Sequence, residues 1–332
     1  MSESEIFLAY QTLFQQLKNF ADEGNNKKNE LQIANSVALE NTFKLLPAYR
    51  NVVTNKFNSK IFSENFATNS HKATENINRW VADKTNGKIE KLLENDLDSM
   101  TMIVLLNAIY FKGTWKYKFD KKKTITSKFT YNVNQEEDVQ MMCQRSNLRY
   151  AHFDDGDLVE LIYSDETDSD TDDNHRLSML IYLPDRRWVK EYQTISGQFA
   201  RILEHGSIKL AARLQALHNA SVNLHLPRFR IESKFKLSKQ LKELGIQHAF
   251  SQGGADFRRI DGGNDLYLHE VYHQTMVEVM EDGTEAAAAT ASEIQTKSLP
   301  VVHQFFVNRP FLFLIRDNYN QLTLFAGVVN KP

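Results

Sequence analysis

Residues 277–300 read VEVMEDGTEAAAATASEIQTKSLP, and the two conformations open to this stretch decide how the rest of the chain is interpreted. The four alanines at 286–289 favour a helix, since alanine has the highest helix propensity. The even-numbered positions from 284 to 294, however, carry small, mostly apolar side chains, and the odd-numbered positions from 285 to 295 carry the charges. This is the alternation of a β-strand. The same segment is therefore suited to a strand within a sheet. Because Gly283 before it has few steric limits, we interpret the segment as a candidate conformational switch.

The composition is that of an ordinary globular chain. It has 332 residues, 42% hydrophobic and 25% charged, and its formal net charge of -2 gives no positive field for nucleic acid. With 6 prolines, 13 glycines and no linker-like stretch, we expect one domain over residues 1–332. The start has no signal-peptide pattern, and no apolar run reaches the roughly 18 residues of a membrane span. We expect no membrane span and a cytoplasmic or unconventionally secreted protein, or an extracellular one if the N-terminus is truncated.

Catalytic and metal-binding signatures are missing from the sequence. There is no G-x-S-x-G elbow, P-loop, dinucleotide fingerprint or H-E-x-x-H motif, and no histidines pair with cysteine at metal-ligand spacing. We therefore predict that the chain is not an enzyme and holds no cofactor or metal. The single cysteine, Cys143, follows two methionines in a strand-like stretch, which favours an inert, partly buried thiol over a nucleophile.

Two kinds of charged region leave alternatives open. Residues 164–175 include six acidic residues, which favours a solvated hairpin loop over a calcium site, because the ligand order of an EF-hand is absent. Basic residues gather at 121–123, and a second basic group consists of Arg228, Arg230, Lys234 and Lys236. Solvated surface charge is the default interpretation of both basic groups, and binding of a polyanion such as heparin is the alternative.

Hydrophobic periodicity predicts a mixed α+β fold. Helical spacing covers residues 6–20, 46–57 and 73–81. Residues 102–111 are nearly all apolar apart from Asn107, which predicts a strand buried on both faces. Further strands are expected at 31–39, 124–133, 157–163, 177–183, 207–214, 221–226, 266–280, 301–306, 311–315 and 322–329, and further helices at 189–204 and 235–244.

The segment that begins at Glu281 resembles the hinge of the reactive-centre loop in inhibitory serpins. The residues that carry this resemblance are Glu281, Gly283, Thr284, Glu285, Ala286, Ala287, Ala288, Ala289 and Thr290. Further stretches are similar to serpin motifs in the family's order: 78–81 (NRWV) with 85–89 (TNGKI), 107–115 (NAIYFKGTW), 226–229 (LPRF), 244–250 (LGIQHAF) and 306–311 (FVNRPF). Each stretch alone is a weak signal, but together they cover essentially the whole chain.

The resemblance implies the serpin fold, with three β-sheets and about eight helices in a monomer. A reactive-centre loop at about 281–300 is then exposed outside a five-stranded sheet. A target protease attacks the loop and forms an acyl-enzyme, and the cut loop inserts as a new central strand. Counting from Gly283 by the family's spacing places the scissile bond at Lys297–Ser298. Lysine fits the acidic specificity pocket of a trypsin-like protease.

The resemblance also assigns roles outside the loop. Trp115 is expected where the loop first enters the sheet, and Asn107 and His273 are expected as polar groups beneath the strands that part. Asn78 belongs to the helix in front of the main sheet. The family begins with additional helices before the region matched by residues 6–20, so we expect an N-terminally shortened serpin. The alternative function is a non-inhibitory or inactive truncated serpin that acts as a binding or chaperone protein.

Overall fold

The computed structural model describes residues 2–24, 29–132, 135–164, 176–186, 207–281 and 301–332. Helices and strands are mixed in these ranges, as expected of an α+β fold. The chain divides into two compact units, one made of residues 1–112 and 231–277 and the other of residues 113–230 and 278–332. A single domain over residues 1–332 stays a prediction.

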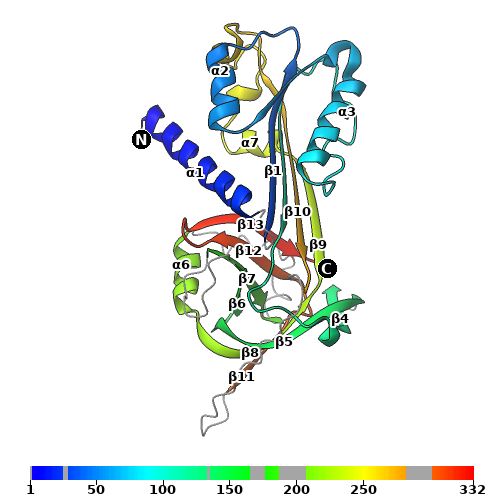
Figure 1. Ribbon diagram of the computed structural model, residues 1–332, viewed down its shortest axis with the longest axis vertical. Helices are drawn as coiled ribbons and strands as arrows, with labels where there is room; N and C mark the ends of the chain where they lie inside the picture. The colour runs from blue at the N-terminus through cyan, green and yellow to red at the C-terminus, as the bar shows by residue number, and fades with distance from the viewer. Residues whose placement is uncertain (1, 25–28, 133–134, 165–175, 187–206, 282–300) are drawn as a thin grey trace. The chain divides into compact units, whose positions relative to one another are not determined.

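The first unit is built on a five-stranded sheet with the order β2-β1-β3-β10-β9. β1 pairs in parallel with β2 and antiparallel with β3, in a register that places Asn35 opposite Asn107. β3 and β10 are hydrogen-bonded neighbours, so in the described part of the chain no strand lies between them. The long strands run side by side in Figure 1; the bounds are β1 (Glu30–Glu40), β2 (Lys60–Glu64), β3 (Ile103–Lys112), β9 (Phe229–Lys236) and β10 (Leu268–Val279).

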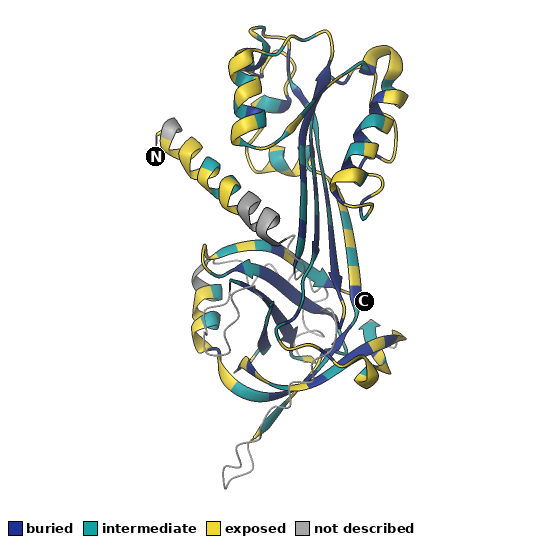
Figure 2. Cartoon of the chain, in the orientation of Figure 1, coloured by how far each residue is buried: buried dark blue, intermediate teal, exposed yellow. Residues whose placement is uncertain are grey.

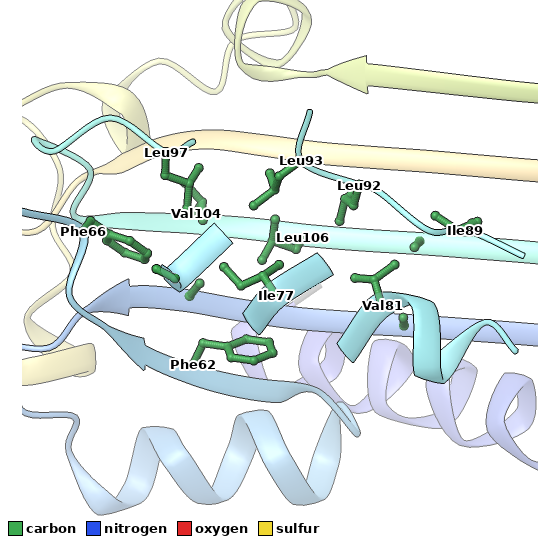
Figure 3. Close-up of a cluster of buried hydrophobic side chains, with 14 of the residues drawn as sticks. Phe62, Phe66, Ile77, Val81, Ile89, Leu92, Leu93, Leu97, Val104 and Leu106 are labelled. Carbon is green, nitrogen blue, oxygen red and sulfur yellow. The ribbon is translucent and has the colours of Figure 1, made fainter. Parts of the chain in front are cut away.

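One face of this sheet is covered by α3 (Phe66–Lys84) and by residues 85–97, which we call the strap. α3 begins after Asn65, whose side chain accepts a hydrogen bond from the amide of Thr68. Figure 3 shows apolar side chains from α3 and the strap meeting alternate residues of β3. Burying each of these larger aliphatic side chains contributes about 1.5–3 kcal/mol. The labelled members of this cluster are Phe62, Phe66, Ile77, Val81, Ile89, Leu92, Leu93, Leu97, Val104 and Leu106.

A second apolar cluster in this unit joins the sheet to short helical elements. Leu39 of β1 and Ile103 of β3 pack in it with Val53, Phe250 and Ile260. The helix predicted over residues 46–57 consists of a short α-helix followed by a π-helical turn. The short elements are α2 (Pro47–Asn51), η1 (Val52–Lys56), α7 (Ser238–Glu243), η3 (His248–Phe250) and α8 (Arg258–Asp261).

The opening helix predicted over residues 6–20 is confirmed as α1 (Glu3–Gly24). Phe7 and Phe14 each meet the ring of Phe57 edge-on, with ring centroids 5.6 and 5.3 Å apart. Ile6 and Leu8 are exposed. α1 therefore uses only part of its apolar surface in these ring contacts.

The second unit contains an eight-stranded sheet with the order β11-β8-β5-β6-β7-β12-β13, and β4 also pairs with β5. β5 is 19 residues long, and it pairs over Met141–Tyr150 with β8 and over Arg149–Phe153 with β6. It therefore joins two sets of strands into one sheet, so the described residues form two sheets instead of the three expected. The bounds are β4 (Ile125–Asn132), β5 (Gln135–Phe153), β6 (Gly156–Ile162), β7 (Leu177–Pro184), β8 (His218–Pro227), β11 (Val302–Phe306), β12 (Phe311–Asp317) and β13 (Leu322–Val329), with a 3-10 turn η2 (Lys121–Lys123).

The centre of this sheet is its most buried part. β7 is buried along its whole length, as Figure 2 shows, and β12 beside it is buried at all but one position. The strand that the sequence predicts over residues 207–214 is wrong, because α6 (Ser207–Ala216) is a helix. Leu210 and Leu214 recur at helical spacing and pack with Tyr182 and Leu312. The helix predicted over 189–204 lies outside the described residues.

Candidate functional site

The chain is held firmly at Glu281, which is the first residue of the predicted hinge and the last one described before residue 301. The residue is 3% exposed, and its Oε1 accepts hydrogen bonds from Arg228 Nε at 2.6 Å and from the hydroxyl of Thr124. Burial alone would raise the pKa of Glu281, but the hydrogen bonds from Arg228 and Thr124 outweigh it and lower that pKa below its ordinary value. A charged carboxylate therefore fixes the end of the segment that follows β10.

Trp115 holds the neighbouring residue of the same segment. Its indole Nε1 donates a hydrogen bond to the carbonyl oxygen of Met280 at 2.9 Å, and the side chain is 2% exposed. The indole is stacked on Tyr163 with ring centroids 4.4 Å apart and planes 11° apart, and burial raises the pKa of Tyr163 well above its ordinary value. The structure therefore places Trp115 beside the start of the predicted hinge, and its role in loop entry stays a prediction.

A chain of three polar side chains crosses β1, β3 and β10. The side-chain amide of Asn107 donates to Asn35 Oδ1, and His273 Nδ1 lies 2.5 Å from Asn107 Oδ1. Because the Asn107 oxygen accepts, His273 carries its proton on Nδ1 in this arrangement. Burial lowers the pKa of His273, which favours the neutral ring. These side chains connect two strands, β3 and β10, that are adjacent in the sheet.

Asn78 serves the strap rather than this polar chain. Its Nδ2 donates to the carbonyl oxygen of Leu93 at 2.8 Å, and its Oδ1 accepts from the amides of Leu92 and Leu93 at 3.1 and 2.9 Å. Thr74 on the same helix accepts from the amide of Leu97 at 3.2 Å. α3 and the strap are thus joined by side-chain hydrogen bonds as well as by their shared apolar cluster.

Apart from Glu281, the residues of the predicted loop lie outside the described residues. These are the reactive bond Lys297–Ser298 and the hinge from Gly283 to Thr290. Of the hinge residues named from the sequence, the structure describes Glu281.

Three residues of the site were not found from the sequence. Arg228 attracted attention as part of a basic group, whereas the structure pairs it with Glu281. Two other members of that group also have acidic partners: Arg230 Nε lies 3.9 Å from Glu278, and Lys234 Nζ lies 3.1 Å from Glu94. Thr124 and Asn35 gave no signal of their own, because their roles depend on which strands lie together. Polyanion binding at Lys121–Lys123 stays the alternative to solvated surface charge.

Cys143 lies in a pair of neutral groups. Its Sγ is 3.2 Å from His225 Nδ1, burial raises the pKa of the thiol, and burial lowers the pKa of His225. A neutral thiol that donates to a neutral imidazole fits these shifts. Across the described ranges, no three histidine, cysteine or acidic side chains are grouped as metal ligands. The helices described in the structure include none with the length and apolar character of a membrane span.

A family model described as serpin (serine protease inhibitor) matches residues 1–332. The chain belongs to the serpin family. The leukocyte elastase inhibitor of Xenopus tropicalis is 36% identical over 314 residues, which cover 92% of this serpin and 80% of the relative. The human leukocyte elastase inhibitor is 34% identical over 305 residues, which cover 91% of this serpin and 78% of the relative.

Solved serpin structures agree with this assignment. Uncleaved ovalbumin is 25% identical, with a TM-score of 0.79, and the match covers 97% of this serpin and 79% of ovalbumin. Thyroxine-binding globulin in complex with thyroxine is 28% identical, with a TM-score of 0.82, and the match covers 99% of this serpin and 82% of the globulin. The predicted family and the α+β fold class are therefore confirmed.

Two expectations need restatement. The expectation that the chain is not an enzyme was based on missing catalytic motifs, which is the wrong basis. The family description is the relevant finding, because it names inhibition of serine proteases, and such inhibition is not enzymatic catalysis. The vertebrate relatives bear the name of elastase inhibitors, so they support a serine protease inhibitor without supporting a trypsin-like target.

Proposed function

We propose that this serpin inhibits trypsin-like serine proteases as a suicide substrate, with Lys297–Ser298 as the scissile bond. The observation that carries the proposal is the anchored end of β10. Trp115 and Arg228 fix Met280 and Glu281, and the small-residue alternation of 284–294 follows directly in the sequence. A strand formed by that alternation would enter the sheet between β3 and β10, which are neighbours.

The chemistry follows from attack on Lys297. The protease serine adds to the lysine carbonyl, the peptide bond to Ser298 breaks, and the new amino terminus at Ser298 leaves with the proton delivered by the protease histidine. The segment from Gly283 to Lys297, now free at one end and esterified to the protease, inserts into the sheet. Insertion separates β3 from β10, so the hydrogen bond between Asn107 and His273 must break. Displacement of the bound protease before hydrolysis of the ester leaves a covalent complex.

Target choice rests on the residue before the scissile bond. Lysine places a positive charge in a specificity pocket that carries an aspartate in trypsin-like proteases. Between Gly283 and Pro300, Lys297 is the one basic residue. The elastase in the relatives' name describes those proteins and does not set the target of this chain.

Incubation with trypsin tests the proposal. We expect a complex that survives denaturing electrophoresis, with Ser298 as the new N-terminus of the released fragment. Lys297→Glu should lower the inhibition rate by at least about a hundredfold, because a like charge meets the pocket acid, and Lys297→Leu should shift inhibition toward a chymotrypsin-like protease. Cleavage at Lys297 without any complex would favour the alternative, a non-inhibitory binding serpin. Equal inhibition of trypsin by the parent and both variants would refute the bond assignment.

A further inference from the structure

The helix α1 carries an exposed surface without charge. The sequence has 12 residues from Ile6 to Leu17, and none of them is charged. Ile6 is 43% exposed and Tyr10 is 55% exposed, and Figure 2 shows exposed residues along much of the described part of this helix. A helix at the surface of a globular protein normally carries charged and polar residues on the side that faces solvent. An exposed apolar surface that lacks such charges marks an interaction site.

One stripe of this surface is separate from the rings that meet Phe57. Ile6, Tyr10 and Leu13 follow one another at spacings of four and three residues, so they lie on one face of the helix, and Ala9 lies between them on that face. Ile6, Ala9 and Tyr10 are exposed, and Leu13 is partly exposed. The two phenylalanine rings that meet Phe57 lie roughly a quarter turn further round the helix. We call Ile6, Ala9, Tyr10 and Leu13 the α1 stripe.

The charge pattern decides which partner fits the α1 stripe. A helix that lies on a membrane surface carries lysine or arginine beside its apolar face, and a charged protein partner is matched by opposite charges. The run that contains the α1 stripe offers neither, since it has no charged residue. A second copy of this chain presents the same uncharged stripe, and a surface that meets itself across a two-fold axis is its own complement. Pairing of two such stripes buries no charge.

We propose that α1 is a self-association surface, on which two copies of the chain pair their α1 stripes as antiparallel helices. The paired length from Ile6 to Leu13 is about 12 Å, so the contact is much smaller than a standard interface of about 800 Å² on each partner. A contact of this size gives a weak dimer in exchange with the monomer. The monomer that the family resemblance implies is then the form at low concentration. The pairing does not depend on the proposed function, because it needs no protease.

The α1 stripe also sets the register of the two helices. With the two-fold axis level with the peptide bond between Ala9 and Tyr10, each Tyr10 meets the small Ala9 of the other copy, and each Ile6 lies level with the other copy's Leu13. The antiparallel direction keeps the two Glu5 side chains apart. Residue 5 of one copy is level with residue 14 of the other, so the Glu5 positions are about 13.5 Å apart along the axis, beyond the Debye length of about 8–10 Å. A parallel pair would place these two like charges at the same level.

Sedimentation velocity of the full chain over about 1–100 µM, a range of weak association, tests the pairing. We expect the average mass to rise with concentration from that of one chain toward that of two. Tyr10→Lys should raise the dissociation constant at least about tenfold, because two like charges meet at the centre of the contact. Leu8→Lys is the matched control, since Leu8 is 62% exposed on the same helix but lies about 160° round it from Tyr10. The Leu8→Lys variant should dimerise as the parent does.

A pair of opposite charges gives an independent measurement. Tyr10→Lys and Tyr10→Glu should each stay monomeric, and their equimolar mixture should dimerise, because unlike charges then meet across the axis. Thermal midpoints equal to that of the parent, measured by circular dichroism, establish that the variants are folded. A parent that sediments as one chain at about 100 µM would overturn the self-association surface. So would a mixture that stays monomeric, or a dimer that Tyr10→Lys and Leu8→Lys weaken equally.

Discussion

At the scale of single residues, Glu281 keeps a charge although the residue is only 3% exposed. Desolvation opposes that charge and raises the pKa, but the hydrogen bonds that Arg228 and Thr124 donate to the carboxylate lower the pKa by more. Removing one partner of a buried carboxylate is destabilising, because the charge that remains is unpaired. The arrangement therefore ties the segment after β10 to Arg228, which follows β8, and to Thr124, which precedes β4, through contacts that depend on ionisation.

Glu281→Gln should lower the free energy of unfolding near neutral pH by about 1.5–3 kcal/mol, the range for a hydrogen bond to a charged group. The folded-state pKa of Glu281 lies below its ordinary value of 4.5, so the contribution of the carboxylate is fully present above about pH 4.5. It is lost as the pH falls through the folded-state pKa. The difference in thermal midpoint between the parent and E281Q should therefore be constant down to about pH 5 and should then narrow.

Thermal unfolding followed by circular dichroism across this pH range measures the effect. Arg230→Gln is the matched control, because the Arg230 side chain is 54% exposed and its Nε lies 3.9 Å from Glu278. It should change the midpoint little. A difference between the parent and E281Q that persists unchanged to pH 3 would contradict the ionised state of Glu281.

At the scale of elements, the sequence predicts secondary structure correctly where the hydrophobic pattern fits only one type of element. The run at 102–111 is apolar on both faces and forms β3 (Ile103–Lys112). Residues 207–214 are too short to separate strand alternation from helical spacing, and packing on Tyr182 and Leu312 favours the helix. Hydrogen bonds between side chains of different strands are harder still to predict from the sequence. Asn35 and Asn107 are 72 residues apart, and only the register of β1 with β3 brings them together.

The alternation at 284–294 gives the sharpest test of whether this segment inserts into the sheet as a strand. Thr284→Arg would bury a guanidinium without a partner as insertion begins, which is costly. The variant should still be cut at Lys297 but should release active trypsin, so the yield of covalent complex should fall by at least about tenfold. Glu285→Arg is the matched control, because position 285 belongs to the alternating set that carries the charges and would face solvent in the inserted strand. Similar yields from both variants, measured by denaturing electrophoresis, would exclude insertion in this register.

At the scale of the whole molecule, the sheet of the first unit has five described strands, and β3 adjoins β10 in it. A sixth strand between them would be hydrogen-bonded on both edges. About ten net hydrogen bonds at roughly 1 kcal/mol each give on the order of 10 kcal/mol before the entropy of ordering the strand is subtracted. This is comparable with the whole stability of a typical domain, about 5–15 kcal/mol. On the proposed mechanism, the uncut chain would be a metastable state, and insertion of the cut loop would release this free energy.

Cleavage of the loop at Lys297 should therefore stabilise the protein, whereas a nick in an ordinary surface loop leaves stability unchanged or lowers it. A limited digest that cuts only at Lys297, verified by the mass of the fragment beginning at Ser298, provides the sample. Its thermal midpoint should lie on the order of 10 °C or more above that of the uncut chain, since a chain of this size shifts by roughly 2 °C for each kcal/mol. The nicked Thr284→Arg variant is the control, because it has the same cut but a blocked insertion, and its midpoint should not rise. Scanning calorimetry of the four samples decides the matter: a parent whose midpoint stays level after the cut does not store free energy in its loop, and it is then a serpin without the insertion step.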